Sequence, residues 1–451
     1  MPEHTRPARG MRDFLPEDVR RRDYVIGIVK DVYRRYGFEP LETPSLENIE
    51  TLTGKYGEEG NKLIFKVLRR GEHEASGEVD LALRYDLTVP LARVVAEYRG
   101  KLPRNFKRYQ IQPVWRADRP ARGRFREFYQ CDVDAIGSTS PVVEVELCSA
   151  VCEVLQKLGF SDFQLLLNHR GLLSGLLDAS GVPAHQHADA LISLDKLDKI
   201  GHDGVLKDLV GRGVDEAVAR RFSDSFVRDR DDNGQLEALA KRFDGHEAGL
   251  QGVRNLQQIL HLSKSTPSAN HMSLAFPLAR GLSYYTGAIM EIRVADLAGS
   301  FGGGGRYDGL IGMFLGENIP ACGFSLGLER ILVVMGERGM FPASAADSAP
   351  ADVMVTLFDD EGVPDALRLG AELRARGVRV EIYPEPSKLG KQFKYTSERR
   401  IRFAVVAGTD ERARHEVTIK NMETGEQSSV PRASAADWLA ARAGERPASP
   451  A

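Results

Sequence analysis

The 451-residue sequence has few of the features that mark membrane, secreted or zinc-binding proteins. It has no apolar run near the roughly 20 residues needed to span a bilayer, and its first ten residues lack the apolar core of a signal peptide. It has only four cysteines, and no two of them form a Cys-x-x-Cys pair, which disfavours zinc clusters and disulfide frameworks. We therefore expect a cytoplasmic protein without a membrane segment, and we predict no metal ligands among its side chains.

The sequence also has little net charge. Its 61 lysine and arginine residues nearly balance 64 aspartate and glutamate residues, which leaves a net charge of −3. No positive field of the whole molecule therefore points to a nucleic acid or a membrane, and any polyanion site has to be a local patch. Hydrophobic residues make up 42% of the chain, enough for a sizeable core, and the length suits two or three domains.

Hydrophobic periodicity divides the chain into an α+β part and an α/β part. Apolar residues at helical spacing predict helices over 16–36 and 142–158, and strand-like runs around them favour an antiparallel sheet flanked by helices. The segment 170–262 is rich in charged residues and lacks strand alternation, which indicates a helical insertion. Residues 342–351, PASAADSAPA, have the composition of a linker. Strands and amphipathic helices then alternate within 352–451, which predicts a parallel sheet covered on both faces.

The densest group of candidate functional residues lies in 103–136. From Pro103 to Gln130, eight basic residues stand against two acidic ones, with aromatic residues between them. Two strand-like halves around a break at Pro120 and Gly123 predict a long hairpin whose loop carries arginines. Guanidinium groups match phosphate oxygens and aromatic faces stack on bases, so the segment suits a nucleotide. A solvated basic hairpin explains this segment equally well when it is taken alone.

Three further segments carry polar residues that suit ligand binding. LRYDLTVPLAR (83–93) contains Asp86 and Thr88, an acid and a hydroxyl that could hold an ammonium group. ARGLSYYTG (279–287) places an arginine before two tyrosines, and GFSLGLERIL (323–332) runs from an apolar strand into a helix. Each segment alone also has an ordinary structural explanation, namely a helix cap, a core tyrosine pair and an exposed helix ion pair.

Together these segments resemble the histidyl-tRNA synthetases, a family of class II aminoacyl-tRNA synthetases. RGMRDFLPED (9–18) and GGGGRYDGL (302–310) add to the resemblance, which follows the family order along nearly the whole chain, and RGLSYYTG is its most specific element. The resemblance implies a class II catalytic domain over 1–341 that contains the helical insertion, and an anticodon-binding domain over 352–451. It also implies histidine–tRNA ligase activity with L-histidine, ATP with Mg²⁺, and tRNA(His), and a homodimer formed through the segment 38–46.

The resemblance also assigns roles to individual residues. Arg116 and Arg280 would flank the α-phosphate of ATP as catalytic cations, because fixed charges stabilise the pentacoordinate phosphorus of the transition state. Arg124 would meet the terminal phosphates, and Phe128 and Arg330 would enclose the adenine. The positions implied for histidine are Asp86, Thr88 and Gln130 at its α-ammonium group, and Asp134 and Tyr285, with Tyr284 beside them, at its imidazole.

A second polyanion site is predicted near the C-terminus. Residues 388–402 hold six basic residues against one acidic residue, with a phenylalanine and a tyrosine between them. Lysines and arginines neutralise phosphates while aromatic rings stack on single-stranded bases, which suits an anticodon loop. The tRNA-binding candidates are Lys388, Lys391, Lys394, Arg399 and Arg400, and a solvated helix face is the competing explanation.

Three rival functions fit parts of the sequence. A catalytically silent relative resembling the regulatory subunit of ATP phosphoribosyltransferase shares the catalytic fold, but such proteins typically lack the anticodon-binding domain and parts of both ligand signatures. A class II synthetase for threonine, proline or glycine has a similar C-terminal domain but lacks RGLSYYTG. A non-catalytic RNA-binding protein would explain the basic hairpin, but it would leave the coincidence of the other segments unexplained.

Overall fold

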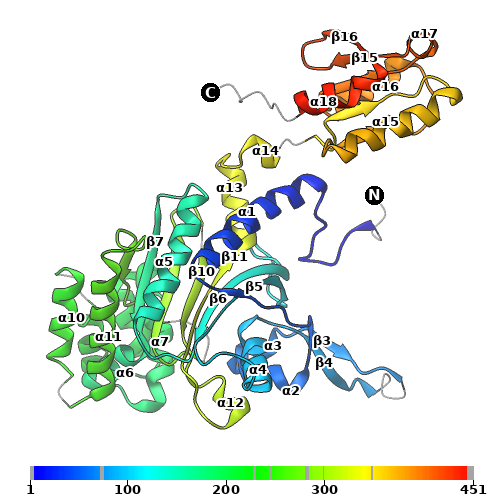
Figure 1. Cartoon of the computed structure of the whole chain (residues 1–451). Helices are drawn as coiled ribbons and strands as arrows, with labels where there is room; N and C mark the ends of the chain where they lie inside the picture. The colour runs from blue at the N-terminus through cyan, green and yellow to red at the C-terminus, as the bar shows by residue number, and fades with distance from the viewer. Residues whose placement is uncertain are drawn as a thin grey trace. The chain divides into compact units, whose positions relative to one another are not determined.

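The chain folds into two compact units, Met1–Met340 and Phe341–Ala451. The computed structural model describes residues 5–71, 76–226, 230–243, 245–279, 284–297, 299–346 and 349–443. Each unit has its own sheet and its own hydrophobic core (Figure 1). No helix within these ranges combines the length and apolarity that crossing a membrane requires.

An eight-stranded sheet forms the centre of the first unit. In spatial order its strands are β1 (Glu39–Pro40), β5 (Phe106–Trp115), β6 (Glu127–Ile136), β11 (Ala321–Gly327), β10 (Ser300–Arg306), β9 (Ala288–Val294), β7 (Phe163–His169) and β8 (Met272–Leu274). Neighbouring strands are antiparallel except at the two edges, where β1 is parallel to β5 and β8 is parallel to β7. The predicted antiparallel sheet is confirmed, and the parallel edge strands are an addition that the sequence did not predict.

Long helices pack against this sheet. They are α1 (Pro16–Arg35), α5 (Val142–Lys157) and α13 (Leu328–Glu337). Helix α1 has acids in its first turn and arginines in its last, the arrangement that the helix dipole favours. Its buried Val25, Val29 and Val32 form one stripe, and the helix packs on α5 and α13, which contact β6 and β11. The periodicity of the sequence therefore correctly predicted α1 and α5.

A second, smaller layer of strands and helices borders the sheet. It consists of β2 (Leu46–Asn48), β3 (Lys66–Leu68), β4 (Val79–Leu83), α2 (Ile49–Leu52), α3 (Gly57–Lys62), α4 (Thr88–Tyr98) and α12 (Gly312–Leu315). Tyr56, Val89, Tyr284 and Tyr307 share one hydrophobic core with this layer. The shared core holds the turn between β4 and α4, which carries Asp86, next to the sheet.

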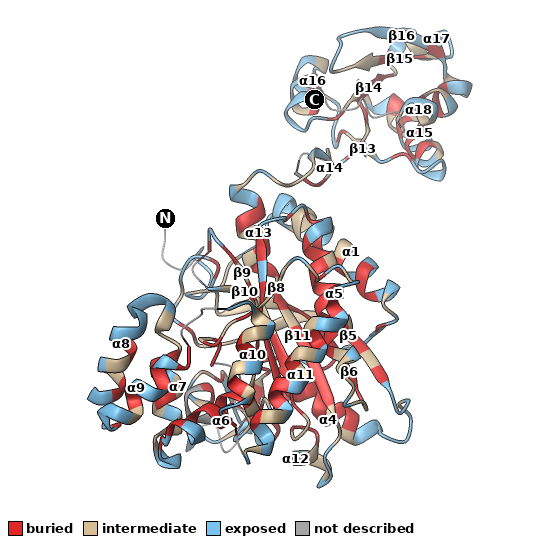
Figure 2. Ribbon diagram, turned by 90° about the vertical axis from the view of Figure 1, so that its left-hand side faces the viewer, coloured by how far each residue is buried: buried red, intermediate tan, exposed pale blue. Residues whose placement is uncertain are grey.

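Between β7 and β8 the described residues are mostly helical. The helices are α6 (Arg170–Ser180), η3 (Ala184–Gln186), α7 (His187–Leu194), α8 (Leu197–Gly211), α9 (Glu216–Asp224), α10 (Asp232–Ala240) and α11 (Glu247–Ser263). Helix α11 contacts α5, β7 and β9, so it joins this region to the sheet. Figure 2 shows these helices gathered to one side of the first unit, with buried residues along α11.

The second unit is an α/β domain with a five-stranded sheet. Its strand order is β13 (Val380–Ile382), β12 (Val353–Val355), β14 (Phe403–Val406), β15 (Glu416–Asn421) and β16 (Gln427–Pro431). The first three strands are parallel, as predicted, but β15 and β16 are antiparallel and were not predicted. Their sequences, EVTIKN and QSSVP, have too many polar residues to stand out as buried strands.

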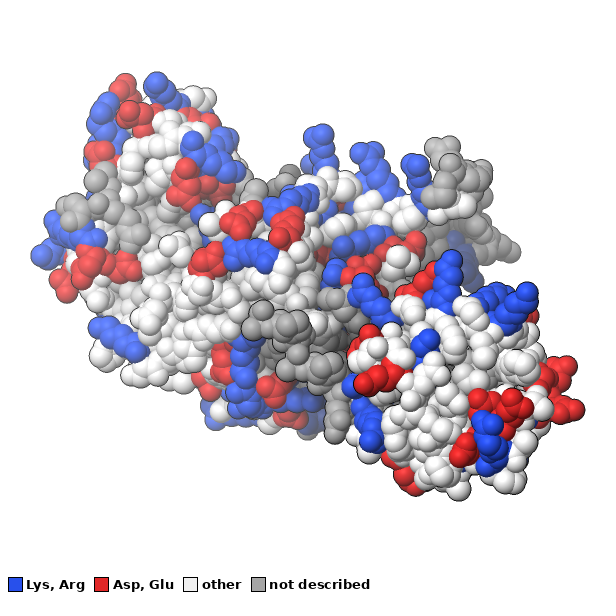
Figure 3. All heavy atoms as spheres, turned by 90° about the horizontal axis from the view of Figure 1, so that it is seen from above, with Lys and Arg blue, Asp and Glu red and all other residues white. Residues whose placement is uncertain are grey.

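The other elements of this unit, in chain order, are α14 (Ala343–Ala346), η4 (Asp360–Gly362), α15 (Val363–Ala375), α16 (Leu389–Glu398), α17 (Thr409–Ala413), η5 (Arg432–Ser434) and α18 (Ala435–Ala443). Helix α14 lies within the segment predicted as a linker. On the face of the molecule shown in Figure 3, basic and acidic side chains are interspersed, in keeping with the net charge of −3.

Candidate active site

A cavity of about 330 Å³ lies in the first unit, against the central strands of the large sheet. Its lining comes from β6, β9, β10, β11 and α13, from the β5–β6 loop and from the turn before α4. Most of the residues predicted for this site line it, namely Asp86, Thr88, Arg116, Arg124, Phe128, Gln130, Asp134, Tyr285 and Arg330. Arg280 lies outside the described residues. Segments more than 200 residues apart in the chain thus meet at one cavity.

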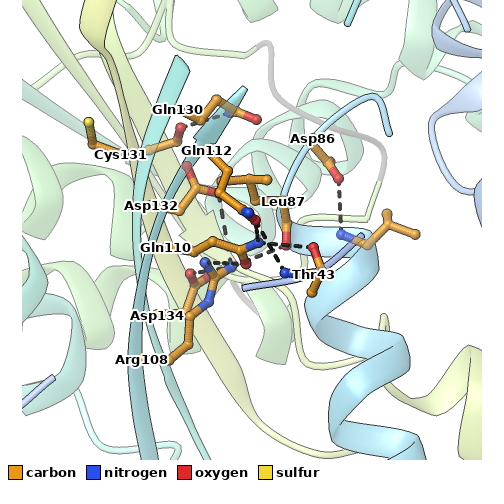
Figure 4. A network of polar contacts seen from close by, with 12 residues as sticks. Thr43, Asp86, Leu87, Arg108, Gln110, Gln112, Gln130, Cys131, Asp132 and Asp134 are labelled. Carbon is orange, nitrogen blue, oxygen red and sulfur yellow. Dashed lines mark hydrogen bonds and ion pairs between the residues drawn. The ribbon is translucent and has the colours of Figure 1, made fainter. Parts of the chain in front are cut away.

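One end of the cavity is acidic because β6 alternates its side chains between two faces. Gln130, Asp132 and Asp134 lie on the same face, and each is more than nine-tenths buried. The β5–β6 register sets Arg108 opposite Asp134, with Arg108 Nη2 2.9 Å from Asp134 Oδ2 (Figure 4). The Tyr307 hydroxyl donates to Asp134 Oδ1 at 2.5 Å. Burial raises the pKa of Asp134, although Arg108 opposes that effect.

Asp86 occupies the turn between β4 and α4 at the same end of the cavity. Its Oδ1 accepts hydrogen bonds from the Tyr56 hydroxyl and the Val89 amide, both at 3.0 Å. Its Oδ2 accepts from the Tyr284 hydroxyl at 3.1 Å. Burial raises the pKa of Asp86. Tyr284 therefore orients Asp86 and, unlike Tyr285, does not line the cavity. The sequence had placed it beside the two imidazole partners.

The cavity also has a basic end, formed by Arg116, Arg124 and Arg330, of which Arg116 borders the acidic end and acts on the charge of Asp86. Arg116 follows β5, donates from Nε to the Tyr85 carbonyl at 3.0 Å, and lies over the rings of Tyr85 and Phe128 at 4.3 and 5.2 Å. Arg124, near the tip of the β5–β6 loop, is exposed and donates to Asp118 Oδ1 at 2.9 Å. These contacts leave both guanidinium groups with further donors for an anion.

Arg330 joins this basic end from the first turn of α13. It donates to the carbonyl groups of Gly123, in the β5–β6 loop, and of Ser300, at the start of β10. Burial lowers its pKa, and the charges of Arg124 and Arg116 lower it further. Three cations that repel one another at one end of a cavity favour an anionic ligand, whose charge relieves the repulsion.

The glycines at 302–305 lie within strand β10. A Cβ atom on Gly302 would lie 2.3 Å from the Ser325 carbonyl oxygen, and one on Gly304 would lie 2.3 Å from that of Gly323. Gly302, Gly303 and Gly304 line the cavity. The absence of side chains on these glycines therefore allows close contact with β11, and their backbone atoms line the cavity.

Four residues of the site were not assigned from the sequence: Arg108, Asp132, Tyr307 and Glu329. Asp132 could have been found, because it lies two residues from both Gln130 and Asp134 on a predicted strand. Arg108 and Tyr307 depend on strand register and on tertiary contacts. An exposed ion pair was the ordinary structural explanation for the segment of Glu329, but Glu329 is 2% exposed and accepts a hydrogen bond from the Tyr129 amide at 2.8 Å.

The predicted tRNA-binding residues of the second unit lie on or next to α16. All five are exposed. Carboxylates lie within 4.0 Å of three of them, in the pairs Lys391–Glu385, Lys394–Glu398 and Arg399–Glu381. Exposed ion pairs of this kind are weak, so a phosphate could replace the carboxylate partner.

Comparison with protein families assigns both units. A family model described as "Histidyl-tRNA synthetase" matches residues 10–331, and a model described as "Anticodon binding domain" matches residues 352–442. The first match includes every lining residue of the cavity. The second includes α16.

Relatives resemble the chain over nearly its full length. The histidine–tRNA ligase of Gloeobacter violaceus is 42% identical, over 96% of this chain and 98% of its own, and that of Porphyromonas gingivalis is 41% identical over the same shares. The crystal structure of histidyl-tRNA synthetase from Nostoc sp. PCC 7120 has a TM-score of 0.79 and 30% identity, covering 97% of this chain and 99% of its own. The chain belongs to the histidyl-tRNA synthetase family of class II aminoacyl-tRNA synthetases.

Proposed function

We propose that this chain is a histidine–tRNA ligase that activates L-histidine with ATP and transfers it to the 3′ end of tRNA(His). The observation that carries the proposal is the division of charge within one cavity. The acidic end, with Asp86 and Asp134, suits an amino acid that bears an ammonium group, and the basic end, with Arg116, Arg124 and Arg330, suits a triphosphate. The carboxylate of a bound histidine would then lie where the two ends meet.

In the first step, a histidine carboxylate oxygen attacks the α-phosphorus of ATP. The new bond forms histidyl-adenylate, and the bond between the α-phosphorus and the bridging oxygen breaks to release pyrophosphate. Negative charge builds up on the α-phosphate oxygens, so a fixed guanidinium group lowers the barrier more than a general base would. Arg116 is held for this role by the Tyr85 carbonyl and by two aromatic rings. The matching role of Arg280 stays a prediction from the family resemblance.

In the second step, the 3′-terminal ribose hydroxyl of tRNA attacks the carbonyl carbon of the adenylate. The bond between this carbon and the phosphate oxygen breaks, an ester forms, and AMP leaves with the electron pair while the hydroxyl proton passes to solvent. Asp86, Thr88 and Gln130 would keep the α-ammonium group in place through both steps, and Tyr285 and Asp134 would hold the imidazole. The buried acceptor Gln130 Oε1 has no partner among the described residues, which suits an ammonium donor.

Mg²⁺ would accompany ATP rather than occupy a protein cage. Among the described residues, no cluster of three His, Cys, Asp or Glu side chains could hold a metal ion. Near the basic end, two carboxylates that line the cavity are both paired with arginines, Glu291 with Arg293 and Asp118 with Arg124. The donor set therefore fits an ion held chiefly by phosphate oxygens and water. Its chemistry there is neutralisation of phosphate charge.

The proposed activity is tested by exchange of pyrophosphate into ATP with each of the twenty amino acids in turn. We expect exchange with histidine alone, followed by esterification of tRNA(His). No exchange with any amino acid would favour a silent relative, and exchange with a different amino acid would overturn the assignment of the acidic end.

Helix α16 is proposed to bind the anticodon arm. The double variant Lys391→Ala/Lys394→Ala should raise the KM for tRNA(His) several-fold and reduce its salt dependence by about one unit of log–log slope per lost phosphate contact. Pyrophosphate exchange should be unchanged, because the cavity is in the other unit. Arg376→Ala is the control, since Arg376 is exposed immediately after α15 and pairs with Asp437 instead. An unchanged KM and salt slope in the double variant would contradict the placement.

We further propose a homodimer through the segment 38–46 and a cytoplasmic location. Strand β1 forms an edge of the large sheet, and Leu46 at the end of this segment is 41% exposed. Light scattering should give twice the 49.8 kDa mass of one chain. A monomer at micromolar concentration would contradict the dimer without affecting the assignment of the cavity.

A further inference from the structure

Asp132 is a buried carboxylate that the proposed mechanism does not use. It lies between Gln130 and Asp134 on the same face of β6, lines the cavity and is 1% exposed. Its Oδ1 atom is buried without a hydrogen-bond partner among the described residues. An unpaired buried acceptor is costly, so its presence beside a cavity points to a donor on the ligand.

Asp134 is closer to a cation than Asp132 is, although its Oδ2 atom also accepts no hydrogen bond among the described residues. Arg108 Nη2 lies 2.9 Å from Asp134 but 4.0 Å from Asp132, and Tyr307 donates to Asp134 as well. The hydrogen-bond partners of Asp86 are two tyrosine hydroxyls and one backbone amide, all neutral, and the charge of Arg116 opposes the rise in its pKa. The three carboxylates thus outnumber the guanidinium groups near them, of which Figure 4 shows Arg108, so negative charge is left to be balanced when all three acids are ionised.

We propose that Asp132 is a specificity-determining residue that selects histidine with its ring protonated, as an imidazolium cation. The α-ammonium group balances Asp86 and the ring balances Asp132, so neither charge stays unpaired in the complex. Same-face neighbours on a strand are about 7 Å apart, which is close to the reach of histidine from its α-nitrogen into its ring. A histidine whose ammonium group meets Gln130 thus has its ring beside Asp132, with Asp134 beyond. This inference rests on the proposed function.

The same arrangement explains rejection of other amino acids. A neutral side chain of similar size would leave the Asp132 charge buried and unpaired, a penalty that a purely apolar slot could not impose. Asp132 would therefore add charge selection to the hydrogen bonds that Asp134 and Tyr285 offer to the ring nitrogens.

The proposal predicts that histidine binding takes up a proton at alkaline pH. Burial raises the pKa of Asp132 to about 7, and a free imidazole has a pKa of about 6.5. Above pH 7, Asp132 in the empty pocket and the ring of free histidine are therefore both deprotonated, whereas the complex contains a proton on the ring. Binding must take one proton from solvent, so the affinity falls as the pH rises.

Other ionisable groups act on Asp132 from the neighbouring elements. They are Arg108 on β5, Asp134 on β6, Asp86 before α4, Tyr33 on α1, Cys131 on β6 and Tyr285 before β9. Burial raises the pKa values of Tyr33, Cys131 and Tyr285, which therefore stay neutral near pH 7. Burial also raises the pKa of Glu329 to about 7. Glu329 lies beside Arg330, at the end of the cavity proposed for ATP, so histidine binding is measured without ATP.

Isothermal titration calorimetry of the full chain with L-histidine tests the proposal. At pH 8, in two buffers with different ionisation enthalpies, the wild-type protein should take up about one proton per histidine bound, and its Kd should rise about tenfold per pH unit from there. Asp132→Asn should bind several-fold more weakly at pH 7 and take up no proton at pH 8. The α-ammonium group of histidine also loses its proton at higher pH, which weakens binding to the wild-type and the Asp132→Asn protein alike. The ratio of the two Kd values therefore isolates the effect of Asp132.

Cys131→Ala is the matched control, because Cys131 is the next residue on β6 and its side chain lies on the opposite face. It should keep the proton uptake. Histidine binding without proton uptake by the wild-type protein would overturn the inference and leave the proposed function intact, and this result does not depend on the folding of any variant. Uptake that persists in a folded Asp132→Asn protein would overturn it too. Absence of both histidine binding and histidine-dependent exchange would instead overturn the proposed function.

Discussion

Arg116→Ala is expected to lower kcat for histidine-dependent pyrophosphate exchange by about 10²–10³-fold, the usual loss when one fixed donor to a developing oxyanion is removed. Arg116 enters the cavity from the end of β5, held by the Tyr85 carbonyl and by the rings of Tyr85 and Phe128. The alanine variant keeps the cavity but loses the cation. The KM for histidine should change less than kcat, because the variant keeps Asp86 and Asp134, the residues proposed to bind the amino acid.

Arg122→Ala is the control for this prediction. Arg122 lies in the same β5–β6 loop, but it pairs with Glu337 and the Asp296 carbonyl and does not line the cavity. Steady-state exchange kinetics of the two variants, with circular dichroism as a check on folding, separate a lost cation from a disturbed loop. Near-normal kcat in a folded Arg116→Ala protein would remove Arg116 from the mechanism.

Arg108→Met should lower the free energy of unfolding of the first unit by about 3–5 kcal/mol, because it leaves buried carboxylates without their cation. Arg108 is fully buried, and Asp132 and Asp134 both lie within 4.0 Å of it. Methionine keeps much of the side-chain volume, so the loss reports mainly on charge. Urea unfolding followed by Trp115 fluorescence in a Trp438→Phe background measures it, since the sequence has two tryptophans, one in each unit.

The loss of stability in Arg108→Met should depend on pH in a defined direction. Burial already raises the pKa values of both carboxylates above their unfolded value of about 3.9, and loss of Arg108 raises them further. Groups with raised pKa values favour the folded state at low pH and lose that contribution as the pH rises through the folded pKa. The difference from wild type should therefore be small near pH 4 and grow through pH 7.

Lys107→Met is the control for the stability measurement. Lys107 precedes Arg108 on β5 and pairs with Glu146 at a partly exposed site, where an ion pair contributes about 0–1 kcal/mol. Equal effects of the two substitutions, or a pH-independent loss in Arg108→Met, would show that the buried charges do not set the stability of this strand pair.

Local sequence patterns predicted much of the fold. The helices α1 and α5, the β5–β6 hairpin and the parallel strands of the second unit all have a strong periodicity or a run of apolar residues. The strands β15 and β16 were missed because a half-exposed strand with polar residues has no such run. The parallel pairing of β1 and β8 at the sheet edges was missed because each has only two or three residues.

The sequence predicted which residues belong to the candidate site, but it did not predict which of them contact one another. The resemblance to a family named nine residues that line the cavity, since each lies in a recognisable segment. The resemblance did not predict that the Tyr284 hydroxyl donates a hydrogen bond to Asp86, because this bond joins segments almost 200 residues apart. It also did not assign Asp132, whose importance depends on which neighbouring acid Arg108 compensates.

The amino-acid sequence alone therefore determined the family, the order of the elements and the types of charge that a ligand would meet, because motifs and periodicity are local properties of the chain. The tertiary structure decided which charges are compensated. Strand register sets Arg108 opposite Asp134, so its guanidinium group lies 2.9 Å from Asp134 and 4.0 Å from Asp132. Burial then makes that difference matter, because an uncompensated charge costs little in water and a great deal inside a protein.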